Sequence, residues 1–306
     1  MEFCIDFVSL QYFDRKNLRN LNNCVNLQTK MNSCDYMKRK LSICLFGLSL
    51  MVLATSCGEY NKVLKSTDYN YKYEYAKKAF EKKKYGQATT ILADLVTVFK
   101  GTANAEESLY LLGLSHYENK DYMNSGSYFK TYYQHYPKGQ YAELARYYAG
   151  YGYYLDSPDP QLDQTGTYKA IEELQSFLDY FPKSDKATIA LNAIFELQDK
   201  LVLKELQNAQ LYYNLGNYLG NNYESAVIVA KNAIKDYPYS KYKEDLEMLV
   251  LKARFQEANQ SVDIKKAERF RDVIDEYYSF INDYPQSENR KEADNIYEIA
   301  KKYVKE

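Results

Sequence analysis

The sequence has few of the residue types that most often serve catalysis and metal binding. Among its 306 residues are five cysteines and two histidines, and no cysteine lies after Cys57. Beyond that position the chain can form no internal disulfide, and it offers no thiol for nucleophilic catalysis or metal binding. The histidines, His116 and His135, fall on different expected helices, and neither a Gly-rich phosphate loop nor an HExxH motif occurs. We therefore expect no catalytic residues, no metal site and no cofactor, and predict that the protein is not an enzyme.

A strong charge of one sign and a membrane-spanning apolar run are also missing. After Cys57 the chain has 33 Lys and Arg residues against 37 Asp and Glu residues, a net charge of about −4. This balance has no basic bias that would favour a nucleic acid as partner. The apolar stretch at residues 41–54 has 14 residues. That is too short to span a bilayer but within the range of a signal-peptide core.

The residues around this stretch have the order of a bacterial lipoprotein signal. Three consecutive cations precede it, and small residues follow it up to Cys57. This order predicts a signal peptide at residues 37–56 and a mature chain that starts at Cys57, with lipid on the sulfur and the amino group of that residue. Residues 57–68 then form a lipidated tether. The alternative is a buried apolar helix with an incidental cysteine.

Residues 1–36 precede this signal, although a secretory signal should begin the chain. They contain three of the five cysteines and many asparagines, and they show no sustained amphipathic period. We expect that Met37 is the true start and that residues 1–36 are a mis-annotated extension, or are disordered if they are translated.

The rest of the chain has the pattern of helices. Only 12 glycines and 6 prolines occur, and almost no window alternates with the period of a strand. Apolar residues instead recur at spacings of three and four, which predicts amphipathic helices. One such series is Ala226, Val229, Ala230, Ala233 and Ile234.

The helical segments repeat along the chain. Aromatic-proline dipeptides end several of them, because proline lacks an N–H and fixes its φ angle, so that it stops one helix and helps to start the next. Ala76, Gly113 and Gly150 recur at steps of 37 residues and would let the two helices of a hairpin approach closely. The dipeptides are Tyr136-Pro137, Phe181-Pro182, Tyr237-Pro238 and Tyr284-Pro285.

These repeats resemble tetratricopeptide (TPR) units, most clearly in the spacing of Leu109, Leu112, Gly113, Ser125, Phe129 and Pro137. We predict an all-α fold at residues 69–306, an α-solenoid of about five TPR-like helical hairpins with a C-terminal capping helix. The fourth hairpin is overlong, and its first part is either one helix or two helices that break near Val202. The expected hairpins are residues 69–100, 103–137, 140–182 with a loop at 156–167, 184–238 and 240–285, and the capping helix is residues 288–305.

A lipoprotein signal followed by about 250 residues of irregular TPR-like units resembles the BamD family, the TPR-repeat lipoproteins of the outer-membrane β-barrel assembly machine. The resemblance is carried by the front hairpin around Tyr75-Ala76 and by the aromatic-Pro-x-Ser pattern that closes the later units at Ser184, Ser240 and Ser287. It implies a lipid-anchored protein on the periplasmic face of the outer membrane. It also implies two partners, unfolded outer-membrane proteins and the barrel-forming core protein, the latter bound towards the C-terminal units.

The first helices of the front three hairpins carry an aromatic ladder. Its members recur 37 residues apart, and within each helix they lie seven residues apart, close to two turns, so that each pair shares one face. The ladder either holds a peptide with aromatic residues, such as the C-terminal signal of an unfolded outer-membrane protein, or packs between hairpins as core. The sequence leaves both readings open. The candidate peptide-binding residues are Tyr73, Phe80, Tyr110, Tyr117, Tyr147 and Tyr154, with Leu114 and Tyr151 between the pairs.

Taken together, these features predict a lipid-anchored scaffold for the insertion of outer-membrane proteins. The alternative is a TPR lipoprotein that binds a glycan or nutrient for an outer-membrane transporter. Proteins of that second kind tend to be longer and to carry large non-helical inserts, whereas this chain has one short expected loop.

Overall fold

The computed structural model describes residues 58–304, and every regular element in this range is a helix. The expected extension at residues 1–36, the signal peptide at 37–56 and the lipidated Cys57 lie outside the described residues. The chain divides into two compact units, one ending at Lys72 and the other starting at Tyr73. In the first unit, residues 58–65 are helical and α2 begins after Asp68, whose carboxylate accepts hydrogen bonds from the amides of Asn70 and Tyr71.

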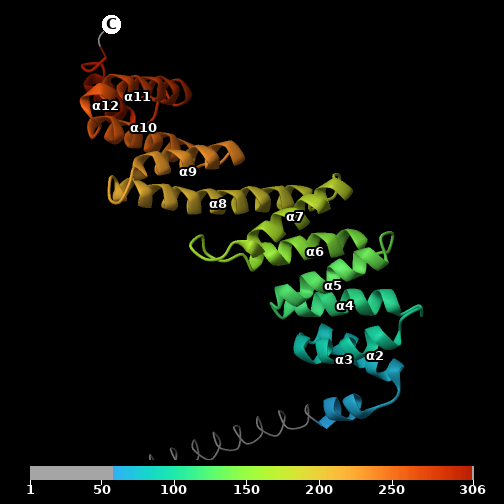
Figure 1. Ribbon diagram of the computed structural model, residues 1–306. Helices are drawn as coiled ribbons and strands as arrows, with labels where there is room; N and C mark the ends of the chain where they lie inside the picture. Colours follow the sequence, from blue (N-terminus) through green and yellow to red (C-terminus); the bar gives the residue numbers. More distant parts are fainter. Residues whose placement is uncertain (1–57, 305–306) are drawn as a thin grey trace, which may run out of the picture. The chain divides into compact units, whose positions relative to one another are not determined.

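The helices from α2 to α11 form five hairpins, and α12 follows the last of them. This arrangement confirms the all-α fold of TPR-like helical hairpins (Figure 1). The helices are α2 (Tyr69–Glu81), α3 (Tyr85–Val98), α4 (Ala105–Glu118), α5 (Tyr122–His135), α6 (Ala142–Leu155), α7 (Thr165–Tyr180), α8 (Ala187–Leu215), α9 (Asn222–Asp236), α10 (Lys243–Asn259), α11 (Asp263–Asp283) and α12 (Arg290–Ala300).

The aromatic-Pro-x-Ser pattern has a regular structural role at the end of three hairpins. The amides of Phe181, Tyr237 and Tyr284 still donate to carbonyls four residues earlier, and the proline that follows each one ends the helix. The serine of the pattern then makes a turn, because its hydroxyl accepts a hydrogen bond from the amide two residues further on. The repeated motif is therefore the turn that reverses the chain between hairpins.

From α3 onward each helix packs against its neighbours in the chain, and from α4 onward the first helices of successive hairpins also contact one another. Those contacts join α4 to α6, α6 to α8, α8 to α10 and α10 to α12. The first helices therefore share one face, as the TPR pattern predicts. In Figure 1 the hairpins can be followed in chain order from α4 to α12.

Helix α8 is longer than the others, with 29 residues, and it is unbroken at Val202. Its sequence has neither Gly nor Pro, and it belongs to two hydrophobic cores. Ile194 and Leu197, in its first half, pack in a core with Phe177 of α7. Val202 and Ala209, in its second half, pack in a core with residues of α9 and α10. The break that the sequence left open does not occur, because packing on both sides holds one continuous helix.

Two other boundaries differ from those expected. Helix α7 starts at Thr165, so the loop between α6 and α7 covers residues 156–164 and is shorter than the expected 156–167. The capping helix α12 covers Arg290–Ala300, within the expected residues 288–305. It starts later because Ser287 forms the turn described above, and residues 301–303 form a closing turn.

Small residues allow close contact between helices at the positions that the repeat singles out. A Cβ atom on Gly113 would lie 3.0 Å from the ring of Phe129 on α5. Ser125, which is buried on α5, donates a hydrogen bond of 3.0 Å to the carbonyl of Gly113. The tightest of these contacts is at Gly150 of α6, where a Cβ atom would lie 2.8 Å from both Cγ and the backbone nitrogen of Leu174 on α7.

Candidate functional site

The structure divides the aromatic ladder into a buried series and a half-buried series. Tyr73, Tyr110 and Tyr147 form the buried series, with exposed fractions of 4, 8 and 5 %. Each packs on an aromatic ring of another element, Tyr73 edge-on to Phe99, Tyr110 stacked on Tyr141 at 4.1 Å between ring centroids, and Tyr147 edge-on to Phe177. These three residues are part of the packing between helices and offer little surface to a ligand.

The remaining five ladder residues are half-buried, and we call them the aromatic edge. Tyr151 contacts Tyr154, with ring centroids 5.1 Å apart, and it stacks on the buried Tyr147. Tyr117 of α4 contacts Tyr148 of α6, which in turn contacts Tyr147, so the α4 and α6 parts of the edge are joined through aromatic rings. The aromatic edge consists of Phe80, Leu114, Tyr117, Tyr151 and Tyr154.

Burial and neighbouring groups hold several of these phenols in the neutral form. Burial, with the neighbouring tyrosines, raises the pKa of Tyr147 to about 12. The hydrogen bond from Tyr154 to the Glu196 carboxylate, followed by burial, raises the pKa of Tyr154 to about 12 as well. Burial also raises the pKa of Tyr110 and of Tyr117. Water therefore reaches even the half-buried rings only in part.

These shifts predict a loss of stability at alkaline pH. A phenol has a pKa near 10 in an unfolded chain, so a folded-state pKa of about 12 makes a contribution to stability that is complete below pH 10. That contribution is lost as the pH rises from 10 to 12. We expect phenolate absorbance and helical circular dichroism to change together over this range. Ionisation of all tyrosines near pH 10 with the helices intact would contradict the packing described for the ladder.

A cleft of about 590 Å³ lies beside Tyr154, between the end of α6, the 156–164 loop, α8 and the turn into α10. The loop is attached to α8 by Lys200, whose Nζ donates to Ser157 Oγ at 2.8 Å, and by Lys204, whose Nζ donates to the Leu162 carbonyl at 3.0 Å. Gln207 accepts a hydrogen bond from Gln161. Lys200, Lys204 and Gln207 are spaced four and three residues apart on α8, and this spacing is the sequence signal for the face that they share.

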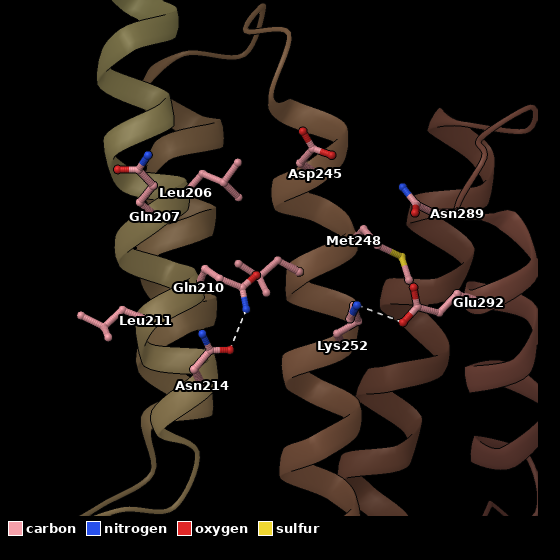
Figure 2. A pocket seen from close by; sticks show the side chains of 11 residues that line it. Leu206, Gln207, Gln210, Leu211, Asn214, Asp245, Met248, Lys252, Asn289 and Glu292 are labelled. Atoms are coloured by element: carbon pink, nitrogen blue, oxygen red, sulfur yellow. Dashed lines mark hydrogen bonds and ion pairs between the residues drawn. The ribbon is translucent and has the colours of Figure 1, made fainter. Parts of the chain in front are cut away.

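A second cleft, of about 550 Å³, lies further along the same face, between α8, α10 and α12 (Figure 2). Apolar side chains of α8 and α10 line it together with amide and charged groups. Lys252 of α10 forms an ion pair of 3.0 Å with Glu292 of α12 beside the cleft. No site was expected here from the sequence. The lining residues are Leu206, Gln207, Gln210, Leu211, Asn214, Asp245, Met248, Leu249, Lys252, Asn289 and Glu292.

The histidines lie where they stabilise helices. His116 Nδ1 is 2.8 Å from the carboxylate of Asp121 at the start of α5, and its ring stacks on Tyr128. His135 Nδ1 lies 2.8 Å from the carbonyl of Thr131, one turn earlier in α5. In residues 58–304 no group of His, Cys, Asp and Glu side chains could hold a metal ion.

The comparison with protein families covers the front of the molecule. Residues 66–222 match the sequence model of the family YfiO, described as an outer membrane lipoprotein. The match includes the three hairpins with the aromatic ladder and all of α8. No curated protein matches the chain. None of the helices in the described part of the chain is both long enough and apolar enough to cross a membrane.

Proposed function

The chain belongs to the YfiO family of outer membrane lipoproteins, and on this basis we propose that it is a lipid-anchored scaffold of the machinery that assembles β-barrel proteins in the outer membrane. Its partners would be unfolded outer-membrane proteins and the barrel-forming core subunit. The observation that supports this proposal most is the extent of the family match. It covers the helical hairpins with the aromatic edge and the whole of α8. The resemblance to BamD in the aromatic-Pro-x-Ser turns supports the same role.

The proposed position is the periplasmic leaflet of the outer membrane, with lipid on Cys57. Gly58 follows this cysteine, and the tether at residues 57–68 contains no run of acidic residues after the cysteine. Several acyl chains on one residue give firm anchoring, whereas a single chain binds a membrane only marginally. An anchor at this point would tether the scaffold to the membrane into which barrels are inserted.

We assign client binding to the aromatic edge and not to the whole ladder, because the buried tyrosines are packed against other rings. Half-buried aromatic residues with polar tips can accept varied apolar anchors without requiring one sequence. The C-terminal segment of an unfolded outer-membrane protein, with its aromatic end, would be such an anchor. The 590 Å³ cleft beside Tyr154 extends this surface towards α8.

A double variant in which alanine replaces both Tyr117 and Tyr151 is expected to bind a labelled peptide with an aromatic C-terminus about tenfold more weakly, because two aromatic contacts are lost. Fluorescence anisotropy with the purified full-length lipoprotein would measure this. The matched control is Tyr239→Ala, which removes a tyrosine that is 87 % exposed in the turn between α9 and α10. Equal affinity of the double variant and wild type would exclude the aromatic edge as the client site.

A further inference from the structure

The cleft between α8, α10 and α12 has the features of a second peptide site. The proposed client-binding surface lies on α2, α4 and α6, whereas this cleft uses later helices, two of which lie beyond the family match. Its lining on α8 runs from Leu206 to Asn214, a stretch of nine residues whose eight steps rise about 12 Å along the helix. An extended chain rises about 3.3 Å per residue, so this length fits three or four residues.

The cleft has an apolar floor where two cores meet. Leu249 belongs to the core that α8 shares with α9 and α10, and Met248 belongs to the core of α10, α11 and α12. Leu211 stands at the side of the cleft with 58 % of its surface exposed, unlike the buried Met248 and Leu249. An apolar side chain of an occupant would cover Leu211 and rest on this floor.

The polar lining favours an extended occupant over a helical one. Gln210 donates to Asn214 Oδ1 at 2.9 Å, which leaves the Gln210 carbonyl and the Asn214 amino group for other partners (Figure 2). Within residues 58–304 the Asn289 side chain makes no hydrogen bond. Side-chain amides both donate and accept, so they can pair with the N–H and C=O groups of an extended chain. A helix has already satisfied those groups internally and would not use them.

The charge of the cleft sets a preference among extended segments. Lys252 and Glu292 neutralise each other across α10 and α12. Asp245, in the first turn of α10, is exposed and has no ion-pair partner among the described residues. The charge left over is therefore negative, which attracts a cationic side chain and repels an anionic one.

We propose that this cleft binds an extended polypeptide segment that places an apolar side chain on Leu211, Met248 and Leu249 and a Lys or Arg side chain beside Asp245. That the segment belongs to an unfolded client is the one part of this proposal that rests on the proposed function. The contacts that bind the segment do not depend on where it comes from, since they are hydrogen bonds between its main chain and the side-chain amides and one contact between opposite charges.

A charge exchange with synthetic peptides tests the proposal on the full-length lipoprotein in phospholipid nanodiscs. The probes are two short capped peptides of Ser and Thr with a central leucine, which differ only in one neighbouring residue, lysine or glutamate. Wild type is expected to bind the lysine peptide about tenfold more tightly, since one contact changes from attraction to repulsion. Asp245→Lys is expected to reverse this order, and Asp263→Lys, the same change in the first turn of α11, to leave it unchanged.

The outcomes separate this cleft from the aromatic edge. Equal affinity for the two peptides, an unchanged order in Asp245→Lys, or the same reversal in Asp263→Lys would each overturn the proposal. Asp245→Lys is expected to keep wild-type binding of the aromatic-ended peptide, which shows that the variant is folded. If the charge preference is absent while that peptide still binds, the cleft proposal fails and the proposed function stands. If the aromatic-ended peptide fails to bind wild type, client binding by the aromatic edge fails instead.

Discussion

Replacing Gly150 by valine is expected to destabilise the third hairpin by roughly 3 kcal/mol, which for a domain of this size corresponds to a fall of about 6–12 °C in Tm. Even the Cβ of alanine at this position would lie 2.8 Å from the backbone nitrogen of Leu174. A backbone atom cannot turn aside as a flexible side chain can, so α6 and α7 would have to separate. Leu174 is fully buried, and the separation would open the core that includes Phe177 and the first half of α8.

The matched control for this prediction is Gly166→Ala in the first turn of α7. A Cβ at Gly166 would have no atom within 4 Å, so the substitution adds only the preference of alanine for the helix. Its expected effect is a gain of about 0.5–1 kcal/mol. Thermal unfolding followed by circular dichroism compares the two variants. A Gly150→Val protein as stable as wild type would show that α6 and α7 do not approach as closely as described.

Removal of the proposed lipid anchor at Cys57 is expected to move the protein almost completely from the membrane to the soluble periplasmic fraction. The change exchanges residues 37–56 for an ordinary cleavable secretory signal and replaces Cys57 by serine. Each buried CH₂ of an acyl chain contributes about 0.8 kcal/mol to membrane binding, so the loss of several chains removes most of the affinity. The helical hairpins follow the tether and should fold unchanged.

Intact mass and cell fractionation measure this effect. Wild type is expected to have the mass of residues 57–306 plus a lipid modification, and the variant the same chain without lipid. The helical circular dichroism of the two proteins should be equal. An unmodified wild-type mass, or a wild-type chain that retains residues 1–56, would contradict the lipoprotein signal.

The order of the helices and the turns between hairpins could be predicted from the sequence because they depend on local chemistry. Each aromatic-Pro-x-Ser motif forms its own turn from a proline and a serine hydroxyl, whatever lies beyond. The positions of Gly113 and Gly150 likewise follow from the repeat. That α8 is one continuous helix could also be predicted, since no Gly or Pro occurs in Ala187–Leu215. Its unusual length in a repeat of shorter helices made a break the competing interpretation.

The division of the aromatic ladder could not be predicted in the same way. Tyr110 and Tyr117 lie on one helix, seven residues apart, and have the same periodicity. Tyr110 is buried because Tyr141, at the start of the next hairpin, stacks on it. Tyr117 contacts Tyr122 and Tyr148 and stays half-buried. Burial here depends on contacts between hairpins, which periodicity within one helix does not specify.

The two clefts could not be predicted from the sequence for a related reason. Each is formed by helices from different hairpins, so its lining residues are about 40 or more positions apart along the chain, as with Ser157 and Lys200 or Asp245 and Asn289. Helix α8 lines both clefts and belongs to both adjoining cores. It therefore connects the front hairpins, where we place client binding, to the rear helices.

The central claim, a scaffold role in the assembly of outer-membrane β-barrels, is tested most directly by its partners. The chain, with an affinity tag at its C-terminus, would be purified from detergent-solubilised outer membranes after brief chemical cross-linking, and the co-purifying proteins identified by mass spectrometry. A parallel preparation from cells with the untagged chain gives the background. The proposal predicts enrichment of a large outer-membrane β-barrel with periplasmic repeats. Enrichment of a nutrient transporter in its place, with no such barrel protein, would contradict it.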